Sequence, residues 1–133
     1  MKDISSYIGI PFKEHGRDRG GCDCWGVFRL FYREQLGIEL PSYTDDYESV
    51  SNHKLLSELF KKGTEEKWEK IEAGKEKWGD GILFRISGYP THIGVIVKPG
   101  WFLHILKGCD SVLEYYSSPI WNKRVMGIFR YEP

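Results

Sequence analysis

One cysteine and two histidines have the side chains needed for nucleophilic chemistry. Cys24 follows Gly20-Gly21-Cys22-Asp23 and precedes a stretch of apolar residues with helical spacing. We therefore expect Cys24 to lie in the first turn of a helix, where unpaired backbone N–H groups and the positive end of the helix favour the thiolate. A thiolate beside an imidazole supplied from elsewhere in the chain is an arrangement for nucleophilic catalysis.

His92 and His104 lie in neighbouring segments with the alternating pattern of strands, separated by Lys98-Pro99-Gly100. If these three residues form the loop, Gly94 faces His104, and both histidines project from the same face with Gly94 leaving room between them. A two-residue loop would put the histidines on opposite faces. The three-residue loop predicts that His92 is the general base beside Cys24, and that His104 bonds its far ring nitrogen and fixes its tautomer.

The apolar pattern predicts a mostly buried helix from Cys24 to Gln35 that is ended by Gly37. A second helical pattern begins at Asp45 or Asp46 and ends at Gly63. The charged stretch 64–77 contains either a short strand or a helical turn, and the residues before Cys24 form loops with one helical turn.

The period of the apolar residues changes from 3.6 to 2 after residue 80, which is typical of strands. Helices followed by antiparallel strands predict an α+β fold, with N-terminal helices packed on a five- to six-stranded antiparallel sheet. We expect a single domain over residues 1–133. The predicted strands are 82–86, 92–97, 101–106, 111–115 and 125–131.

Charge and composition exclude several classes of function. Lysine plus arginine and aspartate plus glutamate both number 19, so the formal net charge is zero, which argues against nucleic acid as the main partner. The N-terminus lacks the apolar core of a signal peptide, and no segment has transmembrane length. We therefore expect synthesis in the cytoplasm without a signal peptide, and no membrane span.

The three cysteines do not suggest a disulfide framework, because their number is odd and Cys22 and Cys24 are too close to bridge comfortably. Cys22 and Cys24 with His92 and His104 are an alternative set of metal ligands. The one-residue gap between the cysteines is uncommon in zinc sites, so catalysis is the favoured interpretation. Cys109 follows a predicted turn and has no assigned role.

The sequence resembles the NlpC-type cysteine peptidases of bacterial cell-wall turnover, in particular their phage-tail branch. The matching stretches are Asp23-Cys24-Trp25-Gly26-Val27, Trp78-Gly79-Asp80-Gly81-Ile82-Leu83-Phe84, His92-Ile93-Gly94-Val95-Ile96 and Phe102-Leu103-His104, in the order of the family. The resemblance runs from about Ile8 to Tyr131 and is specific as a combination.

The resemblance implies a papain-like fold with Cys24 as nucleophile, His92 as base and His104 as the orienting third residue. It implies peptidoglycan stem peptides as substrate, typically at a D-γ-glutamyl–diamino acid amide bond, and no metal or other cofactor. A thioester would be the intermediate, and other phage tail proteins are possible partners. The location implied is the virion tail, acting at the bacterial cell wall.

One position departs from the family pattern. Many members carry a tyrosine about twelve residues before the nucleophile, whose hydroxyl helps line the oxyanion site, and Phe12 stands in that region here. Either Tyr7 substitutes, or backbone N–H groups act alone; losing one oxyanion donor typically costs roughly a hundredfold or more in rate. Asp23 and Trp25 are further candidates for this site, although a helix cap and core packing explain them as well.

Two other functions stay open at this point. The chain could be a structural tail-assembly component that keeps the peptidase fold, which Phe12 favours and the Cys24, His92 and His104 set disfavours. It could also be an acyltransferase or deamidase, because the same cysteine–histidine chemistry serves other acyl acceptors.

Overall fold

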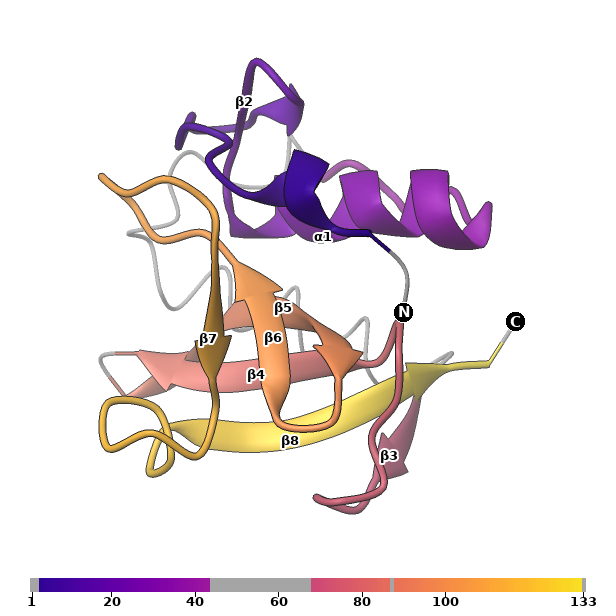
Figure 1. Cartoon of the computed structure of the whole chain (residues 1–133), viewed down its shortest axis with the longest axis vertical. Helices are drawn as coiled ribbons and strands as arrows, with labels where there is room; N and C mark the ends of the chain where they lie inside the picture. The colour runs from indigo at the N-terminus through magenta and orange to yellow at the C-terminus, as the bar shows by residue number, and fades with distance from the viewer. Residues whose placement is uncertain (1–2, 44–67, 87, 133) are drawn as a thin grey trace.

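The computed structural model describes residues 3–43, 68–86 and 88–132. In these ranges a helical layer lies across one face of an antiparallel sheet, which confirms the predicted α+β class (Figure 1). The second predicted helix, from Asp45 or Asp46 to Gly63, falls outside the described residues. None of the helices in the described ranges is long and apolar enough to cross a membrane.

The helical layer is built around α1 (Cys24–Phe31), which continues into the π-helical turn η2 (Tyr32–Leu36). Gly37 ends it with a φ of 66°, a left-handed conformation that glycine adopts without strain. Every residue of α1 except Arg29 is buried, as its apolar pattern predicts. A short 3₁₀ turn, η1 (Ser5–Tyr7), precedes this layer.

The sheet has six strands in the order β3-β8-β4-β5-β6-β7, and every neighbouring pair is antiparallel. The charged stretch 64–77, for which the sequence predicts either a short strand or a helical turn, contains the edge strand β3. A separate two-stranded hairpin precedes α1. The strand bounds are β1 (Arg17–Asp18), β2 (Gly21–Cys22), β3 (Trp68–Ile71), β4 (Gly81–Ile86), β5 (Tyr89–Lys98), β6 (Trp101–His104), β7 (Val112–Tyr115) and β8 (Val125–Tyr131).

The strand that carries His92 is longer than the pattern predicts. β5 begins at Tyr89 rather than at His92, since Pro90 still pairs with Arg85 and Tyr89 with Ile86 beyond an irregularity in β4. The predicted turn over residues 87–90 is therefore shorter. His92 lies within β5 instead of at the start of a strand, and its position is fixed by pairing with Phe84 of β4.

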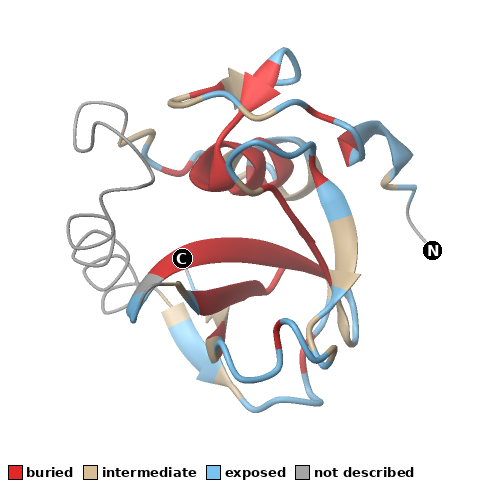
Figure 2. Ribbon diagram, turned by 90° about the vertical axis from the view of Figure 1, so that its left-hand side faces the viewer, coloured by how far each residue is buried: buried red, intermediate tan, exposed pale blue. Residues whose placement is uncertain are grey.

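Alternating side chains of the sheet pack into two apolar clusters, one on each face. The first cluster joins α1 to Ile93, Val95 and Leu103, and the second gathers Phe84, Phe102 and neighbouring side chains. Figure 2 shows the buried residues concentrated on α1 and on the strands facing it. The sheet thus holds the helix on one face and a separate aromatic cluster on the other.

The register between β5 and β6 confirms that His92 and His104 share a face, although the loop differs from the prediction. Lys98 pairs with Trp101, so the loop has two residues, yet Ile96 pairs with Phe102 and Val95 with Leu103. A register shift between Ile96 and Lys98 leaves one extra residue on β5, as in a β-bulge. Because of this extra residue, His92 and His104 lie on the same face, whereas a two-residue loop alone would have placed them on opposite faces.

Glycine is required at position 94, where the two histidines come together. An added Cβ would lie 2.8 Å from Cδ2 of Phe102, 3.0 Å from the carbonyl oxygen of Leu103 and 3.3 Å from Cβ of His104. The sequence predicts this role for Gly94, and the geometry confirms it.

We expect Gly94→Ala to lower the free energy of unfolding by about 1–3 kcal/mol, because the new methyl group overpacks the β5–β6 pair. Urea denaturation measures this change. Gly20→Ala is the control, since its nearest contact is the movable carboxylate of Asp18 at 3.1 Å and its loop is exposed. Equal stabilities of the two variants would contradict this account of Gly94.

Candidate active site

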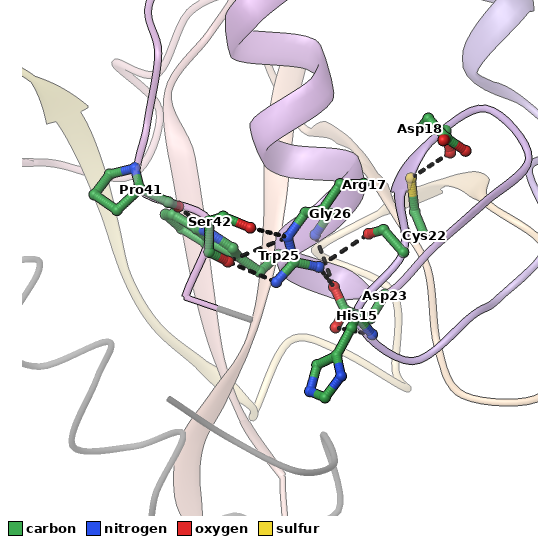
Figure 3. Close-up of polar contacts among 10 residues, drawn as sticks. His15, Arg17, Asp18, Cys22, Asp23, Trp25, Gly26, Pro41 and Ser42 are labelled. Carbon is green, nitrogen blue, oxygen red and sulfur yellow. Dashed lines mark hydrogen bonds and ion pairs between the residues drawn. The ribbon is translucent and has the colours of Figure 1, made fainter. Parts of the chain in front are cut away.

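A buried carboxylate fixes the turn that delivers Cys24. Asp23 is fully buried and is the N-cap of α1; its Oδ1 accepts a hydrogen bond from the Gly26 backbone N–H at 2.8 Å. The same oxygen pairs with the guanidinium of Arg17 at 2.8 Å, while Oδ2 accepts from the His15 backbone N–H at 3.1 Å (Figure 3). Asp23 therefore has a structural role, as the helix-cap alternative predicts.

The loop before α1 packs directly on the helix. Arg17 extends from Asp23 to the carbonyl oxygen of Ser42, which it contacts through two nitrogens (Figure 3). An added Cβ on Gly26 would lie 2.0 Å from the carbonyl oxygen of Gly16, so only glycine permits this approach. The position of Cys24 is thus set by the loop, the cap and the helix together.

Cys24 is the first residue of α1 and its side chain is only 3% exposed. Burial, and next the charge of Asp23, raise the pKa of Cys24 to about 12, while backbone N–H groups of Ile93 and Trp25 beside the sulfur lower it in part. The expectation that the helix start favours the thiolate is therefore wrong for this state. Removing the thiol from water outweighs the helix end.

The two histidines meet ring to ring. Nε2 of His92 lies 2.8 Å from Nδ1 of His104, and both residues are buried. Burial, followed by the neighbouring ring, holds the pKa of His92 well below its ordinary value. Burial also lowers the pKa of His104, against an opposing contribution from Glu114. The pair is neutral near pH 7.

The structure brings Cys24 to the strand of His92, next to the backbone N–H of the following residue, Ile93. In the described part of the chain no hydrogen bond joins the thiol to the His92 ring. Catalytic hydrogen bonds often form only when substrate binds. Because Nε2 of His92 is held by His104, proton transfer to another group must use Nδ1.

Sequence analysis did not identify Glu114 and Trp121, which extend the histidine pair. Nε2 of His104 lies 2.5 Å from Oε2 of Glu114, and the Trp121 indole N–H donates to the same oxygen at 3.1 Å. The Trp121 ring also stacks on His92, with centroids 5.7 Å apart and an interplanar angle of 21°. Extending the strand register to β7 could have identified Glu114. It lies opposite Phe102, which is two residues before His104 and therefore on the same face of the sheet.

The hydroxyl of Tyr7 lies near the other end of the helical layer. It donates to Oε1 of Glu34 at 2.7 Å and accepts from the side-chain amide of Gln35 at 3.0 Å. Because Glu34 belongs to η2 and Cys24 begins α1, this hydroxyl cannot replace the tyrosine expected near the nucleophile. The Tyr7 hydroxyl is instead engaged by Glu34 and Gln35.

Phe12 lies beside the segment that leads into α1, and its side chain carries no hydrogen-bond donor. It forms an isolated parallel bridge with Cys22 and packs against the first apolar cluster. Trp25 is buried, and its indole N–H donates to the carbonyl oxygen of Pro41 at 2.7 Å (Figure 3). Trp25 therefore anchors the loop after η2, and core packing accounts for it.

All three cysteines are free, which agrees with the expectation that they form no disulfide framework. Cys22 donates to the carbonyl oxygen of Asp18, and burial raises its pKa to about 11; Cys109 is exposed. Over the described ranges, no cluster of three or more histidine, cysteine and acidic side chains has metal-site geometry. The alternative ligand set of Cys22, Cys24 and the two histidines does not come together.

We expect Asp23→Ala to lower the free energy of unfolding by about 3–5 kcal/mol, because it removes the carboxylate that pairs with the partly buried guanidinium of Arg17 and also removes the helix cap. Chemical denaturation measures the loss. Glu39→Ala is the matched control: its pair with Arg29 is exposed on the glutamate side, so the expected change is below about 1 kcal/mol. A loss at Asp23 no larger than that at Glu39 would show that the cap is dispensable.

The raised pKa of Cys24 predicts slow alkylation at neutral pH. Iodoacetamide reacts with thiolate, so the labelling rate of Cys24 should keep rising with pH beyond the ordinary thiol value of about 8.5. Peptide mass spectrometry measures the rate, with exposed Cys109 as the internal reference. Rapid labelling of Cys24 at pH 6 would instead demonstrate a thiolate–imidazolium pair.

Comparison with known proteins identifies a family. Residues 9–130 match the sequence profile of the NlpC/P60 family. The chain is 25% identical over 124 residues to the murein DD-endopeptidase MepS/murein LD-carboxypeptidase of Escherichia coli strain K12, covering 93% of this chain and 57% of that protein. It is 27% identical over 133 residues to the tail tip assembly protein K of Escherichia phage N15, covering 99% of this chain and 54% of that protein.

A third relative is the gamma-DL-glutamyl hydrolase of Bacillus subtilis strain 168, 24% identical over 136 residues, with 99% of this chain and 29% of that protein covered. The chain thus spans about half or less of these three relatives. Among solved structures, the NlpC/p60 domain of the peptidoglycan hydrolase SagA has a TM-score of 0.64 at 20% identity, covering 93% of this chain and 89% of that one. This likeness shows the fold.

Proposed function

Since this chain belongs to the NlpC/P60 family, we propose that it is a cysteine peptidase that hydrolyses an amide bond in the peptide stem of bacterial peptidoglycan. Cys24 is the nucleophile, His92 the general base and His104 the residue that orients it. One observation carries the proposal: the His92–His104 bond occupies Nε2 and points to Nδ1 as the base, on the strand segment that lies against the Cys24 thiol.

The chemistry starts from a neutral thiol and a neutral imidazole. Nδ1 of His92 takes the thiol proton as the sulfur of Cys24 attacks the carbonyl carbon. The C–N bond then breaks, the leaving amine receives the proton from Nδ1, and the acyl group remains on sulfur as a thioester. Water, deprotonated by the same nitrogen, hydrolyses the thioester and restores the thiol.

Backbone donors are the remaining means of stabilising the oxyanion. The first N–H groups of a helix have no intrahelical partner; here Asp23 takes that of Gly26 through its side chain and that of Val27 through its carbonyl oxygen. The N–H of Cys24 is left at the position where negative charge develops on the substrate oxygen. Because Phe12 adds no donor, we expect the rate to be lower than with a tyrosine hydroxyl there, by roughly a hundredfold.

The bond is proposed to be a D-γ-glutamyl–diamino acid amide. The name of one relative, a gamma-DL-glutamyl hydrolase, supports a γ-glutamyl bond. The name of another, a murein DD-endopeptidase/LD-carboxypeptidase, supports murein as the substrate but names different bonds. The likeness to a tail tip assembly protein supports a place in a virion tail, with action at the cell wall and contacts to other tail proteins.

The second candidate function is a structural part of a tail assembly that keeps the peptidase fold. Two observations favour it: the phenylalanine at position 12, and the likeness to the tail tip assembly protein over 99% of this chain. Acyl transfer to an acceptor other than water is a third outcome, and products distinguish it from hydrolysis.

Digestion of purified peptidoglycan tests the peptidase. We expect the wild type to release stem-peptide fragments with new amino termini, and Cys24→Ala to reduce the rate by at least about a thousandfold through loss of the nucleophile. Mass spectrometry of the fragments identifies the bond, and Cys109→Ala is the matched control because that thiol is exposed and has no part in the proposed reaction.

Two outcomes would redirect the proposal. No cleavage by folded wild-type protein, together with virions that assemble normally with Cys24→Ala, would favour the structural function. Acyl groups transferred to an added amine at the expense of hydrolysis would favour an acyltransferase.

A further inference from the structure

We propose that Glu114 is a positioning residue that selects, through His104, the tautomer in which Nδ1 of His92 can accept a proton. The chain of contacts is continuous: Oε2 of Glu114 lies 2.5 Å from Nε2 of His104, whose Nδ1 lies 2.8 Å from Nε2 of His92. The inference rests on the proposed function for its catalytic meaning, but the tautomers can be tested without substrate.

Hydrogen-bond chemistry gives only one consistent assignment. A carboxylate accepts hydrogen bonds and donates none, so His104 must carry its proton on Nε2. Its Nδ1 is then an acceptor, and His92 must donate to it from Nε2. The lone pair of neutral His92 is thereby placed on Nδ1, the nitrogen that the proposed reaction uses as base.

The opposite tautomers would be both strained and inactive. With its proton on Nδ1, His104 would face the Glu114 carboxylate with a lone pair at 2.5 Å, which is repulsive. It would also donate to Nε2 of His92, so that His92 would carry its proton on Nδ1 and could not accept one from the thiol. Glu114 therefore excludes the arrangement in which the base is blocked.

The carboxylate is itself held in place. The indole N–H of Trp121 donates to the oxygen that faces His104, and the Trp121 ring, 2% exposed, packs edge-on against His104 with centroids 5.1 Å apart. One aromatic side chain thus orients the carboxylate and covers the histidine pair. The side chain of Glu114 is 33% exposed, so its other oxygen keeps access to water.

Glu114 also acts when His92 takes up the proton. The positive charge then lies on two rings linked to a carboxylate, and a hydrogen bond to a charged group is worth more than a neutral one. Among the described residues, Glu114 on β7 contacts His104, Arg124 has its guanidinium 5.7 Å from the Trp121 ring, and the Cys24 thiol on α1 lies beside the backbone N–H of Ile93, next to His92 in β5. Of these, Glu114 alone is hydrogen bonded to a ring.

Nitrogen NMR of histidine-labelled protein tests the assignment directly. Long-range ¹⁵N–¹H spectra at pH 7.5 distinguish the two neutral tautomers, with His92→Gln and His104→Gln used to assign the signals. We expect both rings to carry the proton on Nε2 in the wild type. In Glu114→Ala, His104 should become a mixture of tautomers. A proton on Nδ1 of His104 in the wild type would overturn the inference.

The pH titration of the rings gives a second readout. Glu114→Gln keeps size and an acceptor but removes the charge, so the midpoint for protonating the pair should fall by about one to two pH units. Glu69→Gln, at an exposed position on the edge strand β3, is the matched control and should titrate as the wild type does. An unchanged midpoint in Glu114→Gln would overturn the inference.

Kinetics separates this inference from the proposed function. If peptidoglycan is cleaved, Glu114→Gln should lower kcat about tenfold to a hundredfold and leave KM unchanged, because Glu114 acts through His104 rather than on the substrate. A wild type with the expected tautomers but no hydrolysis would support the role of Glu114 in the histidine pair and reject the peptidase. A raised KM with normal kcat would reject the positioning role.

Discussion

The position of Cys24, the proposed nucleophile, depends on the buried carboxylate of Asp23. It holds the guanidinium of Arg17, the start of α1 and the backbone at His15 with two oxygen atoms. A carboxylate buried to this extent is tolerable only when each of its charges and lone pairs is matched. The loop, the helix and the segment near Ser42 are therefore tied to one another before Cys24 can be placed.

A single extra residue in β5 positions the histidine pair, in which His92 is the proposed base. The two-residue loop after Lys98 would have turned His104 to the other face, and the register shift between Ile96 and Lys98 turns it back. The same face then collects Phe84, Phe102 and Trp121 around the rings. The Cys24 thiol belongs to the first apolar cluster, on the α1 side, and the two histidine rings contact the aromatic side chains of the second cluster.

Much of this organisation could be predicted from local pattern. The α1 boundary at Cys24, the glycine at position 37 and the antiparallel strands follow from periodicity and turn residues. The shared face of the histidines was predicted correctly for an incorrect loop, because a bulge and an added loop residue change the register in the same way. Sequence pattern cannot distinguish them.

Features that depend on burial and on distant strands were missed. The protonation of Cys24 reverses the expectation, since the sequence shows a helix start but not how completely the sulfur is removed from water. Glu114 was overlooked because its role appears only when the register is followed across one more strand. The hydroxyl of Tyr7 donates a hydrogen bond to Glu34, which lies 27 residues away in the sequence, so no local pattern indicates this contact.

The burial of Cys24 has a consequence for the lifetime of the protein. Peroxide oxidises thiolate that solvent can reach, by stages, to sulfenic, sulfinic and sulfonic acids, and the same thiolate can attack a disulfide to form a mixed disulfide. A sulfur that is 3% exposed and has a pKa of about 12 offers very little of that species. The side chain on which activity would depend is thus stored in a form that resists oxidation, while exposed Cys109 is the thiol that an oxidant meets first.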